Sequence, residues 1–113
     1  MNASIPNLGL GVGWRPEIAL AIERRRDLGF VELTVEEFDD PSPLPLPIEQ
    51  LRRRGTTLIL HGVSLSLGGA EPLDRDRLAA FARLAKQYNV PLVSEHIAFV
   101  RGGGIESGHL LPV

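Results

Sequence analysis

Short apolar runs alternate with amphipathic stretches along the whole chain. Strand-like runs, either continuously apolar or alternating with period two, occupy residues 8–14, 30–38, 56–60 and 92–100. Helical periodicity occupies residues 16–26, residues 48–54, and the segment between Asp74 and Asn89. The pattern therefore predicts four strands and three helices in the order β-α-β-α-β-α-β.

Strands that alternate with helices indicate parallel βαβ units with right-handed connections. Four such strands and three helices fit either a small doubly wound sheet or the first half of a (β/α)8 barrel. A complete barrel needs about 250 residues, and this chain has 113. The α/β class is thus predicted, and a barrel formed by residues 1–113 would be a partial one.

Several local signals set the expected boundaries. Asp74 is a suitable N-cap for the third helix, and Asn89 is a suitable stop because asparagine tolerates the left-handed conformation. Prolines at every second position of residues 39–47 predict an extended surface loop. The glycines of residues 101–104 predict a turn, and residues 108–113 resemble the start of a further element.

Composition narrows the functional classes. Apolar residues make up 43% and charged residues 23% of the chain, and the net charge is −2, which is typical of a globular protein without a nucleic-acid footprint. The absence of cysteine excludes disulfides, thiolate zinc sites and a cysteine nucleophile. The glycines of residues 9–13 lack the dinucleotide-binding spacing. With no signal peptide or membrane span in view, we expect a cytoplasmic protein without nucleic-acid or membrane partners.

Two histidines occupy comparable places on neighbouring strands. His61 ends the third predicted strand, and His96 lies late in the fourth. Sites in parallel α/β folds form at the carboxyl ends of strands, and adjacent strands lie about 4.8 Å apart. Two imidazoles directed the same way could therefore share one transition-metal ion. The alternative is that each histidine is an ordinary hydrogen-bonded core residue.

Three further residues are secondary candidates. Glu95 neighbours His96 on a strand, so the two side chains point to opposite faces, and Glu95 is expected to support a ligand from outside unless a bulge turns it inward. Glu36, near the end of the second strand, is interpreted as a ligand, a base or part of a solvated acidic rim. His109 either reaches over the same mouth or is a surface loop histidine.

Five pieces of the sequence resemble one family. They are GVGWRP at residues 11–16, residues 30–38, LHGVSLSLG at residues 60–68, VSEH at residues 93–96 and LLP at residues 110–112. Together they resemble the multinuclear non-haem iron-dependent oxidases, long catalogued as a domain of unknown function and including the methanobactin-biosynthesis oxidase. The resemblance covers essentially the whole chain and implies the N-terminal portion of a (β/α)8 barrel.

The resemblance also implies a chemistry. Members of this family bind two or three irons and use O₂ to remodel cysteines in ribosomally made peptides, often with a partner protein that presents the peptide. By motif position His61 and His96 would be iron ligands. Many relatives carry histidine where Thr34 stands and an acidic residue near His109, and they draw further ligands from later strands that this chain lacks. The catalytic residues stay unassigned.

Two other functions remain open from the sequence. One is a barrel enzyme with a single divalent metal, similar to sugar isomerases. The other is a non-catalytic fragment that pairs through exposed strand edges.

Overall fold

A computed structural model describes residues 6–38 and 43–113. The strands of this part are β1 (Gly11–Gly13), β2 (Phe30–Thr34), β3 (Thr57–Gly62), β4 (Val93–Glu95), β5 (Phe99–Gly102) and β6 (Ile105–Leu111). Its α-helices are α1 (Ala19–Arg24), α2 (Leu46–Arg53) and α3 (Arg75–Gln87), and 3-10 turns span Pro16–Ile18 and Val35–Glu37.

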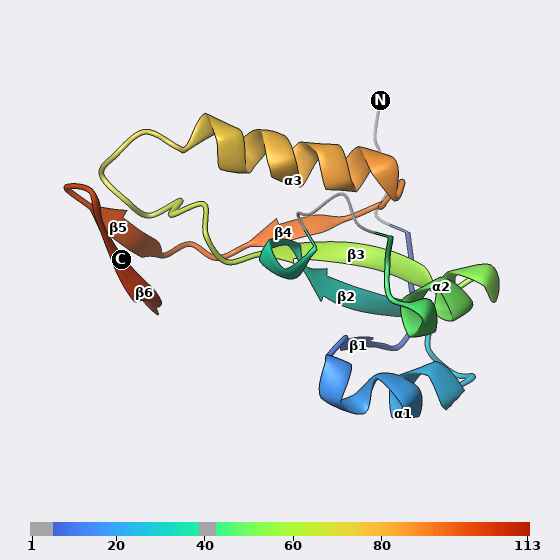
Figure 1. The fold of residues 1–113 in the computed structure, drawn as a ribbon. Helices are drawn as coiled ribbons and strands as arrows, with labels where there is room; N and C mark the ends of the chain where they lie inside the picture. The colour runs from blue at the N-terminus through green and yellow to red at the C-terminus, as the bar shows by residue number, and fades with distance from the viewer. Residues whose placement is uncertain (1–5, 39–42) are drawn as a thin grey trace.

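The first four strands form one parallel sheet in the order β1-β2-β3-β4 (Figure 1). Each strand therefore pairs with the next one along the chain, as the strands of a (β/α)8 barrel do. The predicted α/β class and the four parallel strands with three helices are confirmed, and the arrangement matches part of a TIM barrel.

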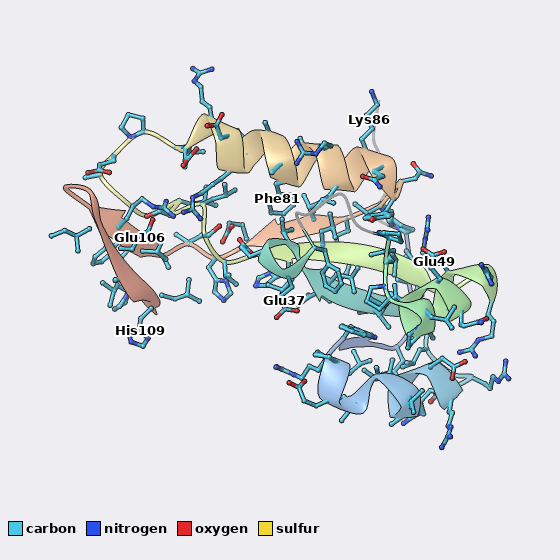
Figure 2. All side chains as sticks on the ribbon, viewed as in Figure 1. Glu37, Glu49, Phe81, Lys86, Glu106 and His109 are labelled. Atoms are coloured by element: carbon cyan, nitrogen blue, oxygen red, sulfur yellow. The ribbon has the colours of Figure 1, made fainter. Side chains whose placement is uncertain are left out.

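The hydrophobic core lies on one face of this sheet. Alternate residues of β2 and β3 meet apolar residues of all three helices there. The set comprises Val31, Leu33, Leu58, Leu60, Ile22, Ile48, Leu51, Phe81 and Leu84. Figure 2 shows Phe81 directed from α3 toward the strands. Because strand side chains alternate, the opposite face carries Glu32, Thr34 and His61 and has no helix packed on it within the described residues.

The predicted helix signals are confirmed at α3. The Asp74 carboxylate accepts hydrogen bonds from the backbone N–H groups of Asp76 (2.9 Å) and Arg77 (3.2 Å). Asn89 has φ +48° and ends the helical segment in the left-handed conformation. Gly55, with φ +91°, follows α2 in the same way.

Two predicted boundaries were wrong near residues 16–38. The first helix divides into a 3-10 turn and the short α1, and β2 ends at Thr34 because residues 35–37 form a 3-10 turn. The alternation of apolar and polar residues in the sequence could not reveal this turn. Val35 is buried and Glu36 is half-buried, as they would be if the strand continued. β3 ends at Gly62, so His61 lies at the end of the third strand, as predicted.

The proline-rich segment also differs from the prediction. α2 begins at Leu46, inside the stretch expected to be extended, with Pro47 in its first turn. Proline is tolerated there because the N–H groups of the first turn have no helical partner. Residues 39–42 of that predicted loop lie outside the described residues.

The fourth predicted strand is broken. β4 contains only Val93–Glu95, and the chain leaves the sheet at His96. Residues 99–102 instead form β5, which pairs antiparallel with β6 across the predicted glycine turn. This hairpin lies beyond the carboxyl ends of the parallel strands (Figure 1). Ser66 and Gly68 tie the loop after β3 to it, through bonds to Val100 N (3.0 Å) and Ala98 O (2.8 Å).

Candidate functional site

The two predicted ligands, His61 and His96, lie side by side. His61 Nε2 is 3.1 Å from His96 Nδ1, and the two ring centroids are 4.6 Å apart with an interplanar angle of 65°. His61 projects from β3 on the face without helices, and His96 directly follows β4. Parallel pairing of β3 and β4 brings together these residues, which are 35 positions apart in the chain.

A row of polar side chains crosses the sheet at His61. Thr34 on β2 and Ser94 on β4 both stand in register with His61, so all three occupy the same face. The Ser94 hydroxyl lies 2.7 Å from His61 Nδ1. Both ring nitrogens of His61 therefore have a polar neighbour, and the ring orientation is fixed from two sides.

The separation of 3.1 Å between the two nitrogens has two chemical meanings. One is a hydrogen bond between neutral imidazoles. The other is two ligands of one cation: nitrogens that each bind a metal at about 2.1 Å stand this far apart when the angle at the metal is about 95°. Within residues 6–38 and 43–113, no group of three or more His, Asp or Glu side chains is placed to hold a metal. The described residues thus offer two imidazole donors and no third ligand.

Glu95 lies on the opposite face of the sheet from His61, as its neighbour relation to His96 predicted. Its carboxylate accepts hydrogen bonds from the backbone N–H groups of His96 (2.8 Å) and Leu65 (3.3 Å). No hydrogen bond joins it to either imidazole ring among the described residues. Glu95 therefore supports the backbone beside the histidines rather than a ring.

Gly62 makes room for that carboxylate. A Cβ built on Gly62 would lie 2.4 Å from Glu95 Oε2 and 2.5 Å from Phe81 Cε2. Any side chain at this residue would displace either the carboxylate or the core ring under α3. The glycine directly after His61 is thus required by packing.

Glu36 holds the loop after β3. Its Oε1 atom accepts hydrogen bonds from Val63 N (3.0 Å) and Ser64 Oγ (2.6 Å). Its Oε2 atom is buried without a hydrogen-bond partner in the described structure. The carboxylates of Glu36 and Glu95 thus accept hydrogen bonds from two backbone N–H groups of the same loop, those of Val63 and Leu65.

His109 is not brought to the histidine pair. It lies on β6 and is exposed, and Figure 2 shows its side chain at the far end of the hairpin. Its backbone N and O atoms both bond to the Ser107 hydroxyl (3.1 and 2.6 Å).

The polar face of β2 borders a cavity. About 170 Å³ of space is lined by the segment 13–17 together with Glu32, Thr34 and Glu37. The sequence left open whether this face meets solvent or a polar site. The residues that line this cavity show that it lies at the carboxyl ends of β1 and β2, on the face of the sheet that bears His61.

An arginine fixes the hairpin next to the site. Arg101 donates to the Ser64 carbonyl (2.6 Å) and, through Nε, to Glu106 (2.7 Å). The hydrogen bond from Arg101 lowers the pKa of the Glu106 carboxyl, even though the group is exposed. The loop after His61 and the hairpin after His96 are thereby joined.

Sequence reasoning missed Ser94. The residue belongs to the same alternating set as His96, and that alternation was the available signal. Its role follows only from the register of β3 against β4, which no local pattern specifies.

A parallel sheet of four sequential strands with helices on one face is the arrangement of part of a (β/α)8 barrel. Residues 9–113 match the family described as RiPP precursor modification enzyme MbnB/TglH/ChrH, where a RiPP is a ribosomally made and later modified peptide. The chain belongs to this family.

Several relatives are proteins of the UPF0276 group. One from Streptomyces avermitilis is 50% identical over 117 residues, which cover 97% of this chain and 24% of the relative. One from Bordetella pertussis is 39% identical over 118 residues, covering 99% and 40%. One from Chromobacterium violaceum is 38% identical over 106 residues, covering 91% and 37%. The chain thus spans 24% to 40% of the length of these relatives.

None of the helices in the described residues has the length and apolar character that crossing a bilayer requires.

Proposed function

We propose that this chain forms the N-terminal part of an iron-dependent oxidase that modifies cysteines in ribosomally made precursor peptides. His61 and His96 would supply two of the iron ligands. The observation that carries the proposal is the 3.1 Å separation of their facing nitrogens, at the carboxyl ends of neighbouring parallel strands. Membership of a family of precursor-peptide-modifying enzymes supports the substrate class.

The two imidazole donors of His61 and His96 are suitable iron ligands. Imidazole nitrogen suits iron and other transition metals, whereas Mg²⁺ and Ca²⁺ prefer oxygen ligands. The 2.7 Å contact from His61 Nδ1 to Ser94 Oγ is the kind of outer contact that metal-bound histidines usually make. Iron held here would supply one-electron and O₂ chemistry. The remaining ligands would come from parts of the longer relatives that this chain does not span.

The chain's own residues would build one wall of the site. His61 and His96 hold the metal, and Glu36 and Glu95 keep the loop after β3 and the break after β4 in place. Glu36, Glu95 and His109 are not needed as ligands in this arrangement. A peptide made on cytoplasmic ribosomes, delivered by a presenting protein, is the proposed substrate, and the proposed location is therefore the cytoplasm.

Metal binding tests the assignment directly. We expect the chain to bind Fe²⁺ under anaerobic conditions, with Co²⁺ as a spectroscopic substitute, and His61→Ala and His96→Ala each to weaken binding by tenfold or more. His109→Ala is the matched control and should bind as the wild type does. Unchanged affinity in both site variants would refute the assignment. Preference for Mg²⁺ or Mn²⁺ over Fe²⁺ would instead favour a barrel enzyme with a single divalent metal.

A further inference from the structure

The proton positions of the histidine pair follow from its neighbours. His96 Nδ1 lies 3.4 Å from the Gly62 carbonyl oxygen as well as 3.1 Å from His61 Nε2. A carbonyl oxygen only accepts hydrogen bonds. A proton on His96 Nδ1 is therefore favoured, because a lone pair there would face the lone pairs of the carbonyl.

That proton sets the state of His61. If His96 Nδ1 donates, His61 Nε2 accepts and carries a lone pair, so the proton of neutral His61 lies on Nδ1. Nδ1–H then donates to the Ser94 hydroxyl at 2.7 Å. Gly62 O, His96, His61 and Ser94 thus form one consistent chain of donors and acceptors across β3 and β4.

We infer that Ser94 is a positioning residue for His61. Its hydroxyl accepts from His61 Nδ1–H in the tautomer that His96 and the Gly62 carbonyl favour, and this hydrogen bond keeps the ring oriented with the Nε2 lone pair directed at His96 Nδ1. Ser94 can do this because it stands in register with His61 on the adjacent strand. The part of this inference that concerns metal affinity rests on the proposed function, whereas the tautomer itself does not.

Histidine ¹⁵N chemical shifts test the tautomer without any metal. In the metal-free chain at pH 9 we expect His61 to show the Nδ1–H pattern. Ser94→Ala should shift His61 toward the Nε2–H form, which free imidazole side chains prefer, and Ser94→Thr should restore the Nδ1–H pattern. Ser107→Ala is the matched control, because it removes a hydroxyl that bonds to His109 backbone atoms on β6.

The same variants give a second measurement. Losing one hydrogen bond of this kind should weaken Co²⁺ binding about three- to tenfold in Ser94→Ala, with recovery in Ser94→Thr and no change in Ser107→Ala. An unchanged His61 tautomer in Ser94→Ala would overturn the inference even if the chain binds metal well. If the wild-type chain binds no metal while Ser94→Ala still shifts the His61 tautomer, the proposed function is refuted and the positioning role of Ser94 stands.

Discussion

Replacing Gly62 with alanine tests whether the backbone beside the histidines is as tightly packed as the structure indicates. The new methyl group would lie 2.4 Å from Glu95 Oε2 and 2.5 Å from Phe81 Cε2, both far inside van der Waals contact. The carboxylate is the flexible end of a side chain and can move. The Phe81 ring is only 7% exposed and belongs to the core under α3, so it cannot move freely.

The expected loss of stability has two sources. Overpacking against the ring costs about 1–3 kcal/mol. A displaced carboxylate also gives up its bonds to Leu65 N and His96 N, at about 0.5–1.5 kcal/mol each. The lower backbone entropy of alanine in the unfolded chain returns about 0.4–1 kcal/mol. We therefore expect Gly62→Ala to lower the free energy of unfolding by about 3 kcal/mol.

Urea denaturation followed by fluorescence measures this change, because the single tryptophan, Trp14, is only 8% exposed in the folded chain. Gly13→Ala is the matched control: a Cβ built there meets nothing within 4 Å. In a Glu95→Ala background the effect of Gly62→Ala should shrink, because the carboxylate no longer competes for the space. A Gly62→Ala variant as stable as Gly13→Ala would refute the packing argument.

Two further predictions concern the sheet face and α3. Thr34→His should place a third imidazole in the row of His61, and we expect Co²⁺ affinity, measured by titration calorimetry, to rise at least tenfold; an unchanged affinity would contradict the register assignment. The hydrogen bond from the backbone N–H of Arg77 lowers the pKa of the Asp74 carboxyl in the folded chain. The ionised carboxylate therefore contributes to stability above the ordinary Asp pKa of about 3.9. This contribution is lost as the pH falls through the lower pKa of the folded state. Comparing urea midpoints of the wild type and Asp74→Asn from pH 6 to pH 2.5 should show the wild-type advantage disappear at the acid end; a constant difference would argue against it.

The elements that sequence predicted well are those with strong local signals. The cap at Asp74, the stop at Asn89 and the alternation of β2 all depend on residues within a few positions of each other. Parallel order followed from the alternation of strands and helices, because few other connections suit such a pattern.

The features that the sequence did not predict depend on contacts between distant segments of the chain. Residues 92–100 are apolar at both ends and were predicted as one strand, but the chain leaves the sheet at His96, where the Glu95 carboxylate accepts a hydrogen bond from the backbone N–H. The roles of Ser94 and Gly62 follow from strand register and from packing against Phe81. The proximity of His61 and His96 could be predicted because both lie at the ends of neighbouring parallel strands. The contacts of Ser94 and Gly62 around them could be identified only from the folded structure.

The histidine pair also has a consequence for folding. An ion bound by both imidazoles would act as a reversible crosslink between positions 35 residues apart, enclosing α3 in the closed loop. Such a link restricts the unfolded ensemble, and ligand binding to the native state alone raises stability with ligand concentration. The midpoint of thermal unfolding would then report how much metal the surroundings contain.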